Sequence, residues 1–256
     1  MSAESRFAGK TVCITGAAQG FGETFAHRFI DEGADGVVIA DINADGARRV
    51  AAEINDRGTG EAFAVTCDVG DETSVQQAAQ LVDERFGGID ILVNNAGKHL
   101  MEYNVPLTVL PRTKWRSLFD VNVIGIVNCA EFFGPLLRAR GGGVIVNISS
   151  IAGYRGSTPY AISKLAVRGL TVGLAEELAA DGIRVCSLTP GLMASPQALQ
   201  ELPAGLIDEF INSNQLIKRQ GEMNDLVGAL FFFCSDEAKF ITGDTLMVSG
   251  GYPLQI

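Results

Sequence analysis

The chain has 256 residues, of which 47% are hydrophobic and 20% are charged, and its formal net charge is −10. The length fits one large α/β domain or two small ones, and the apolar fraction excludes a disordered chain. The acidic charge argues against a nucleic-acid partner, because an acidic surface repels phosphate. Residues 1–10 lack the apolar core of a signal peptide, and no apolar run reaches the roughly 18–20 residues of a membrane span, so no membrane partner is expected.

Short apolar runs alternate with helical patterns along the whole chain. The runs are continuous and rich in β-branched residues, which is typical of parallel strands covered on both faces. This alternation predicts one doubly wound α/β domain over residues 1–256, with a seven-stranded parallel sheet and helices on both faces. The predicted strands are 11–15, 36–41, 61–68, 89–94, 143–149, 183–189 and 245–249. The predicted helices are 20–32, 44–57, 72–86, 114–140, 159–180 and 223–234.

The first predicted strand runs into the glycine-rich turn TGAAQGFG at residues 15–22, which leads into a helix. Gly16, Gly20 and Gly22 permit a tight turn and let the backbone approach a pyrophosphate. The start of the helix then offers unpaired N–H groups to the same anion. A glycine-rich turn alone is also compatible with a plain strand–helix connection.

Asp41 ends the second predicted strand, about 20 residues after Gly22, where a carboxylate accepts hydrogen bonds from a ribose 2′-hydroxyl. The same carboxylate repels a 2′-phosphate, the next residue is Ile42, and the glycine turn has no Arg or Lys. These features favour NAD over NADP as the cofactor. The alternative is that Asp41 caps the following helix.

Polar residues also follow two later strands at their ends. NNAG at residues 94–97 closes the fourth predicted strand, and Ser149 and Ser150 close the fifth. Ligands bind at the carboxyl edge of such sheets, although ordinary turns use the same residues. Asn122 interrupts an apolar helical stretch, and a buried amide needs a partner, so we expect either a packing hydrogen bond or a held water.

Tyr160 and Lys164 stand four residues apart at the start of the fifth predicted helix, which places their side chains on one helix face. A phenol with its ordinary pKa near 10 is a poor base at neutral pH, and a nearby ammonium lowers that pKa by stabilising the phenolate. A Tyr and a Lys four residues apart are common by chance. This pair therefore indicates a catalytic site only together with the motifs around it.

One long stretch, residues 192–222, contains no predicted strand. It holds Pro196, Pro203 and a predicted helix at about 204–212. An irregular segment of this length in a compact domain is often a lid or a binding loop, so we predict that it is the substrate-binding loop.

The five cysteines stand singly, which predicts reduced thiols in a cytoplasmic protein rather than a disulfide framework. The two histidines, His27 and His99, belong to no cluster with metal-ligand spacing. We therefore expect no metal site.

Taken together, these motifs resemble those of the short-chain dehydrogenase/reductase family, in its compact single-domain branch. The resemblance covers residues 8–251 and implies a Rossmann fold, an oxidoreductase that acts on alcohols, and a homotetramer that pairs helices 114–140 and 159–180. In chain order, the matching segments are TGAAQGFG at 15–22, Asp41, Asp68-Val69, NNAG at 94–97, Asn122, Ser149-Ser150, Y-x-x-x-K at 160–164 and Pro190-Gly191.

The resemblance also implies roles for individual residues. Tyr160 would be the general acid/base, Lys164 would lower its pKa, Ser150 would orient the substrate oxygen, and Asn122 would hold a water in a proton relay. The cofactor would be held by Gly16, Gln19, Gly20, Phe21, Gly22, Asp41, Ile42, Asp68, Val69, Asn95, Ala96, Gly97, Tyr160, Lys164, Pro190, Gly191 and Ser195.

The chain departs from the family pattern in its active-site loop. Tyr160 follows Ser150 by only ten positions, two or three fewer than is usual in the family, so the loop takes a tighter path. His99, Tyr154 and Met193 are candidate substrate contacts. The mostly apolar and aromatic surroundings indicate a medium-sized alicyclic, aromatic or hydroxyacyl-type alcohol or ketone.

These observations favour an NAD-dependent enzyme that interconverts a secondary alcohol and a ketone. Three alternatives use the same fold: an NADP-dependent 3-oxoacyl-type ketoreductase, a relative that uses bound NAD for dehydration or epimerisation, and a non-catalytic NAD-sensing protein.

Overall fold

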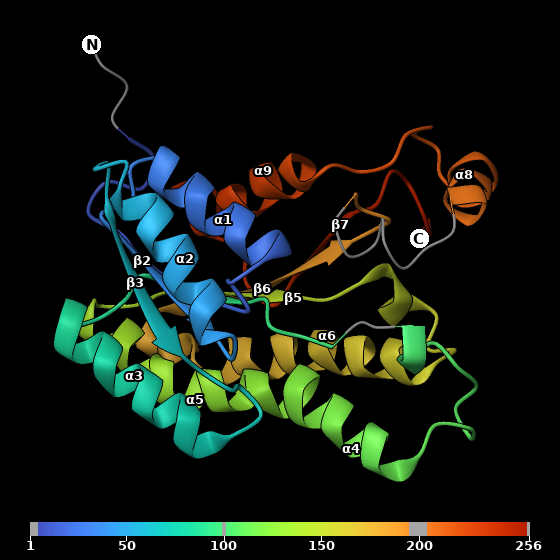
Figure 1. The fold of residues 1–256 in the computed structure, drawn as a ribbon, viewed down its shortest axis with the longest axis horizontal. Coiled ribbons are helices and arrows are strands. Elements are labelled where there is room, and N and C mark those ends of the chain that lie inside the picture. Colours follow the sequence, from blue (N-terminus) through green and yellow to red (C-terminus); the bar gives the residue numbers. More distant parts are fainter. Residues whose placement is uncertain (1–4, 99–100, 195–203, 255–256) are drawn as a thin grey trace.

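The computed structural model describes residues 5–98, 101–194 and 204–254. Seven strands form one parallel sheet in the order β3-β2-β1-β4-β5-β6-β7, with helices on both faces (Figure 1). This is a single-domain Rossmann-like fold, as predicted. The strands are β1 (Thr11–Thr15), β2 (Gly36–Asp41), β3 (Glu61–Thr66), β4 (Ile91–Asn94), β5 (Gly143–Ile148), β6 (Ile183–Pro190) and β7 (Thr245–Val248).

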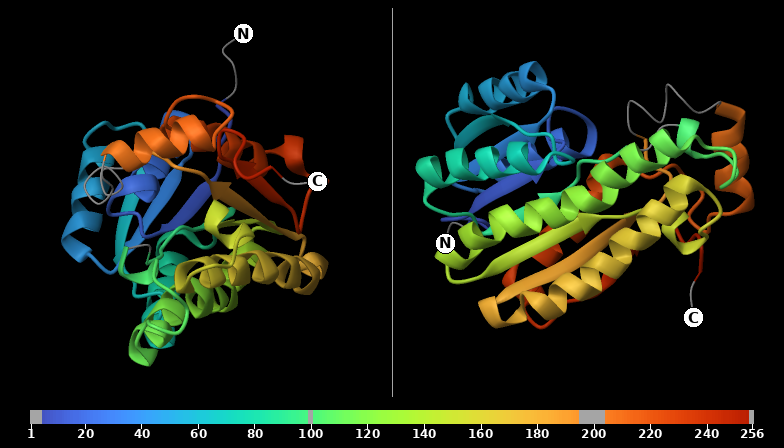
Figure 2. Two further views of the ribbon diagram at one scale, coloured as in Figure 1. Left: turned by 90° about the vertical axis from the view of Figure 1, so that its right-hand side faces the viewer. Right: turned by 90° about the horizontal axis from the view of Figure 1, so that it is seen from below.

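Helices cover both faces of the sheet (Figures 1 and 2). Two layers of apolar side chains hold them there. Successive strand residues point to opposite faces, so Val12 and Ile14 of β1 enter one layer and Cys13 enters the other. One layer contains α1 (Gly20–Asp31), α2 (Ala44–Asn55) and α9 (Met223–Cys234). The other contains α3 (Glu72–Phe86), α5 (Gly125–Ala139) and α6 (Pro159–Glu177).

The prediction of one continuous α-helix over residues 114–140 is wrong, because the middle of this run is not α-helical. The structure has α4 (Arg112–Phe119), a π-helical turn at Asp120–Ile124, and then α5. By length and composition, the continuous helical run Arg112–Ala139 would suit a membrane span, but 56% of its most apolar window is buried inside the protein. The run is therefore buried to the extent expected of a core helix. Its π-helical turn contains the buried Asn122.

The predicted substrate-binding loop begins after β6, and its two described ends pair with each other. Met193 forms an isolated parallel bridge with Gly221. The helix predicted near 204–212 is α8 (Ala204–Ser213), which lies beyond the tip of β7 (Figure 1). All five cysteines are free, as the sequence predicted. Four of them are buried, whereas Cys234 is only partly buried, so the expectation that all five are buried is wrong for Cys234.

The packing of α9 gives a test of the core. Leu230 on α9 is fully buried, whereas Leu81 on α3 is 46% exposed. We expect Leu230→Ala to lower the free energy of unfolding by about 3 kcal/mol, because it leaves a cavity, and Leu81→Ala to lower it by less than about 1 kcal/mol. Urea unfolding of the two variants measures this difference, and equal losses would contradict the assigned core.

Candidate active site

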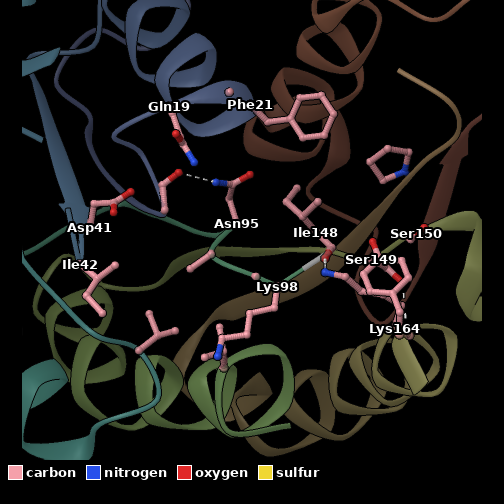
Figure 3. A pocket seen from close by; sticks show the side chains of 18 of the residues that line it. Gln19, Phe21, Asp41, Ile42, Asn95, Lys98, Ile148, Ser149, Ser150 and Lys164 are labelled. Atoms are coloured by element: carbon pink, nitrogen blue, oxygen red, sulfur yellow. Dashed lines mark hydrogen bonds between the residues drawn. The ribbon is translucent and has the colours of Figure 1, made fainter. Parts of the chain in front are cut away.

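A cavity of about 700 Å³ lies at the carboxyl ends of the central strands. Figure 3 shows Asp41 and Ile42 at one end of it and Ser150 and Lys164 at the other. The cavity therefore joins the predicted nucleotide site to the predicted catalytic site. The predicted residues that line it are Gly16, Gln19, Gly20, Phe21, Asp41, Ile42, Asp68, Val69, Asn95, Ala96, Gly97, Ser150, Tyr160, Lys164, Pro190, Gly191 and Met193.

The glycine turn packs directly on the segment that follows β4. A Cβ on Gly16 would lie 2.7 Å from the Cα of Ala96, and one on Gly22 would lie 2.4 Å from the carbonyl oxygen of Gly16. The side-chain amide of Asn95 donates to the carbonyl of Gly16 at 2.9 Å. These close approaches leave no room for side chains, so glycine is required for packing at both positions.

The start of α1 suits an anion. Its N-cap residue, Gln19, makes no side-chain hydrogen bond to the helix, so side-chain capping leaves the N–H groups of the first turn free. These groups lie beside the cavity wall formed by Gly20 and Phe21. The arrangement matches the place where a pyrophosphate binds in this type of fold.

Asp41 is buried, and both of its carboxylate oxygens accept backbone hydrogen bonds. Ala18 donates to one oxygen at 2.9 Å, and Asn43 donates to the other at 2.8 Å. The N-cap of α2 is Asn43, so Asp41 is not a helix cap. The carboxylate instead ties the glycine turn to the end of β2.

Val69 is fixed at the same end of the cavity by a contact that the sequence analysis missed. Its carbonyl accepts a 2.9 Å hydrogen bond from the buried side-chain amide of Asn128 on α5. A Cβ on Gly125 would lie 2.8 Å from the Val69 side chain, so α5 approaches closely at this point. The side chain of Asp68 turns back to accept a hydrogen bond from Gly70 at 3.0 Å.

Tyr160 begins α6 after an N-cap by Thr158, whose hydroxyl accepts a hydrogen bond from Ala161 at 3.2 Å. Burial raises the pKa of Tyr160, and a hydrogen bond with Ser150 partly opposes that shift. In the structure, therefore, Ser150 is the group that favours the phenolate of Tyr160.

Lys164 lies one turn further along α6 and is only 6% exposed. Its ammonium donates to the carbonyl of Ile148 at 2.8 Å and lies 6.0 Å from the centre of the Tyr160 ring. Burial lowers the pKa of Lys164 to about 8. The sequence predicts that Lys164 lowers the pKa of Tyr160. In the structure, the Lys164 ammonium instead donates to the Ile148 carbonyl at the end of β5.

The two serines after β5 have different partners. The hydroxyl of Ser149 donates to the carbonyl of Lys164 at 2.9 Å, whereas Ser150 bonds to Tyr160. Ser150 is therefore the serine beside the phenol, and its catalytic role stays a prediction.

Asn122 lies in the π-helical turn and is buried. Its amide oxygen accepts from the backbone N–H of Lys98 at 2.7 Å, and its amide nitrogen donates to the Lys98 carbonyl and to the Ser163 hydroxyl, each at 3.0 Å. The expected packing hydrogen bonds are confirmed. A water held by Asn122 stays a prediction.

The remaining predicted contacts divide into three groups. Met193 is buried and lines the cavity. Tyr154 is not among the lining residues, and its ring lies 3.6 Å from the Arg168 guanidinium. Its contact with substrate stays a prediction. His99 and Ser195 lie outside the described residues.

Ser149, Lys98 and Leu192 also line the cavity. The lining residues that were not predicted, because nothing in their local sequence marks them, are Cys67, Gly70, Ser117, Asp120, Val121 and Ile148. Lys98 brings a positive charge to the wall, and its ammonium bonds to the Ser117 hydroxyl. Burial raises the pKa of Cys67 to about 12, so this thiol stays neutral.

The structure brings together one group of possible metal ligands that the sequence spacing did not reveal. Glu23 and His27 on α1 meet Glu53 on α2, with their ligand atoms within 4.8 Å of one another. However, the Arg49 guanidinium bonds to Glu23 at 2.9 Å and to Glu53 at 2.8 Å. A cation from the chain itself therefore already pairs with both carboxylates.

Comparisons with known proteins agree with this geometry. A family model described as Enoyl-(Acyl carrier protein) reductase matches residues 16–253. A 7alpha-hydroxysteroid dehydrogenase of Escherichia coli is 35% identical over 249 residues, which cover 96% of this chain and 95% of that protein. A 3-oxoacyl-(acyl-carrier-protein) reductase of Staphylococcus epidermidis is 34% identical over 245 residues, which cover 94% of this chain and 98% of that protein.

Two solved structures are also similar. A gluconate 5-dehydrogenase from Burkholderia cenocepacia, in complex with NADP and tartrate, has a TM-score of 0.90 and 32% identity, covering 99% of this chain and 98% of its own. A 7 alpha-hydroxysteroid dehydrogenase complexed with NADH and 7-oxo glycochenodeoxycholic acid has a TM-score of 0.89 and 33% identity, covering 97% of this chain and 96% of its own.

The buried Lys164 predicts a pH dependence of stability. Its pKa is about 8 in the folded protein, whereas an unfolded lysine titrates near 10.4. Between these values the unfolded chain binds more protons at this position, so its contribution to stability increases with pH through that window. We expect the free energy of unfolding of the wild type, relative to Lys164→Met, to increase from about pH 8 to about pH 10. Urea unfolding without cofactor measures this, and a flat or falling difference would contradict the buried ammonium.

Proposed function

The chain belongs to the short-chain dehydrogenase/reductase family and is an oxidoreductase acting on CH–OH groups; from its site we propose that it uses NAD to interconvert a secondary alcohol and a ketone. The observation that carries the proposal is that one cavity is lined by Ser150, Tyr160 and Lys164 and also by the glycine turn and Asp41. The hydroxyl groups of Ser150 and Tyr160 can both reach one substrate oxygen.

The residues present fit a nicotinamide dinucleotide. The open N-terminus of α1 and the close-packed glycine turn suit the pyrophosphate, and Asp41 suits an adenosine ribose. Lys164 and Tyr160 line the opposite end, beside Pro190 and Gly191. When bound, the nicotinamide ring supplies the hydride acceptor or donor.

The chain itself handles the proton. In ketone reduction, Ser150 donates a hydrogen bond to the carbonyl oxygen and the Tyr160 hydroxyl donates its proton to that oxygen. In alcohol oxidation, the phenolate of Tyr160 takes the hydroxyl proton back. Burial raises the pKa of Tyr160 and so favours the neutral phenol, which is the form needed for reduction. Lys164 and Asn122 hold α6 and the loop after β4 in place around it.

Three features support NAD rather than NADP. Asp41 places a negative charge at the end of β2, where a 2′-phosphate would be repelled. The next side chain, Ile42, is apolar and 67% exposed. The nearby Arg49 guanidinium already bonds to Glu23, Glu53 and the carbonyl of Ala18 at 3.0 Å, so it is occupied by partners within the chain.

The alternatives carry less support. An NADP-dependent 3-oxoacyl-type ketoreductase is consistent with the similar reductase of Staphylococcus epidermidis, but Asp41 disfavours it. The presence of all four residues Asn122, Ser150, Tyr160 and Lys164 is not explained by a non-catalytic NAD sensor. It is not explained by an enzyme for dehydration or epimerisation either.

For the substrate we propose a medium-sized alicyclic, aromatic or hydroxyacyl-type alcohol or ketone. The cavity wall beside Ser150 and Tyr160 includes the apolar side chains of Leu192 and Met193. Such a wall favours the carbon skeleton of a substrate rather than a highly hydrated polyol.

We further propose a cytoplasmic homotetramer. The free thiols of all five cysteines support a reducing compartment. Exposed apolar side chains along these two helical runs support their pairing between copies, namely Ile124 just before α5, Val127 on α5, and Leu165 and Val172 on α6. A Cβ on Gly169 or Gly173 would meet nothing within 4 Å, so α6 has room for a close neighbour there.

Tyr160→Phe tests the proposed proton transfer. We expect this variant to lower kcat by about 10²–10⁴-fold, because it removes the acid/base hydroxyl, while NADH still binds. The measurement is nicotinamide absorbance against a panel of secondary alcohols and ketones, with NADH fluorescence for binding. Undiminished turnover by Tyr160→Phe would make the mechanism wrong.

Asp41→Ala tests the proposed cofactor preference. We expect the wild type to bind NAD⁺ more tightly than NADP⁺, and the variant to lose about tenfold in NAD⁺ affinity, since a hydrogen bond to a charged group contributes about 1.5–3 kcal/mol. Asp45→Ala is the matched control, because the Asp45 side chain on α2 is 93% exposed. Tighter NADP⁺ binding by the wild type would contradict the proposal and favour the ketoreductase alternative.

A further inference from the structure

Tyr252, near the C-terminus, contacts two segments that are distant in sequence. Its ring meets the Phe210 ring of α8 edge to face, with the centroids 5.1 Å apart. Its hydroxyl accepts a hydrogen bond from the Arg155 guanidinium. Arg155 belongs to the loop between Ser150 and Tyr160, which we call the catalytic loop (residues 151–159), so Tyr252 joins this loop to the substrate-binding loop.

The segment that leads to Tyr252 is also fixed to the substrate-binding loop by its backbone. The carbonyl of Gly250 accepts hydrogen bonds from the N–H groups of Leu216 at 2.9 Å and Ile217 at 3.0 Å. The backbone N–H of Tyr252 donates to the Ser249 hydroxyl at 3.2 Å. Tyr252 therefore extends from a backbone that is already anchored at both β7 and the end of α8.

The substrate-binding loop connects this anchor to the cavity. Gly221 pairs with the chain just after β6, donating to the carbonyl of Leu192 at 3.1 Å and accepting from the N–H of Ala194 at 2.7 Å. Met193, between Leu192 and Ala194, is buried and lines the cavity. Residues 214–221 therefore connect the end of α8 to the cavity wall at Met193.

The catalytic loop connects the other partner of Tyr252 to the reacting groups. Ser150 accepts a hydrogen bond from the N–H of Ala152 at 3.2 Å, which begins the short 3-10 helix Ile151–Tyr154. Arg155 follows directly after this helix, while Ser150 at its start bonds to Tyr160. The Arg155 side chain is exposed, so its bond to Tyr252 does not serve to satisfy a buried charge.

From these contacts we propose that Tyr252 is a positioning residue, which holds the substrate-binding loop against the catalytic loop and so sets the distance between Met193 and Ser150 across the substrate end of the cavity. The inference rests on the proposed dehydrogenase function. Tyr252 is not among the described residues that line the cavity, so its expected effect is on substrate binding and alignment.

Four variants test this proposal by steady-state kinetics on the best alcohol of the panel. Tyr252→Phe keeps the ring against Phe210 and removes the hydroxyl, and Arg155→Ala removes the donor. We expect each to raise KM about three- to tenfold, with kcat, the Kd for NADH and the Tm close to those of the wild type. The double variant should be no worse than either single variant, because both remove the same bond. Leu254→Ala is the matched control, since Leu254 is 72% exposed.

A second measurement needs no substrate, so it separates failure of this proposal from failure of the proposed function. We expect Tyr252→Ala with NADH bound to exchange amide hydrogens faster than the wild type in two segments, 151–157 and 207–217, and at the wild-type rate in α2 and α3. Unchanged exchange in both segments would overturn the proposal. Additive effects of the two single variants, or a matching loss of NADH affinity and Tm in Tyr252→Phe, would also overturn it.

Discussion

The hydrogen bonds that fasten α6 to the end of β5 determine the geometry of the whole site. The ammonium of Lys164 donates to the carbonyl of Ile148 at 2.8 Å, and the hydroxyl of Ser149 donates to the carbonyl of Lys164 at 2.9 Å. Further along the helix, the buried amide of Asn147 donates to the hydroxyl of Thr171 at 3.0 Å. Each of these groups would cost about 1–3 kcal/mol if buried without a partner, so strand and helix have little freedom to slide. Tyr160, one turn before Lys164, is thereby held beside Ser150.

A second polar contact fixes the opposite wall of the site. The amide of Asn122 makes two hydrogen bonds to the backbone of Lys98 and one to Ser163 of α6. It makes them from a π-helical turn, which is a rare conformation that occurs often at functional sites. The loop after β4, the middle of the long helical run and α6 therefore meet at a single side chain. The dinucleotide end of the cavity depends on the same loop, because Asn95 bonds to Gly16.

The sequence predicted most of the fold, because continuous β-branched runs and amphipathic helices report burial directly. Residues 11–15 and 36–41 are strands with the predicted bounds. Two other strands are shorter than predicted, because β3 ends at Thr66 and β4 begins at Ile91. In both cases the apolar run in the sequence extends beyond the residues that form the strand. The break at Asp120–Ile124 was not predicted, since it depends on partners that Asn122 finds only in the folded chain. Asn128 and Tyr252 were not predicted for the same reason. Asn128 acts through one long-range contact and Tyr252 through two, and neither residue stands in a local motif.

The central claim is that this cavity transfers a hydride between a carbinol carbon and a nicotinamide, with Tyr160 handling only the proton. The most direct measurement uses a secondary alcohol that carries deuterium at the carbinol carbon, with NAD⁺ and the wild-type protein in ordinary water. We expect the deuterium in the reduced nicotinamide, because a hydride passes directly from carbon to carbon. Recovery of the deuterium in the solvent, or no reduced nicotinamide with any alcohol of the proposed class, would contradict the account.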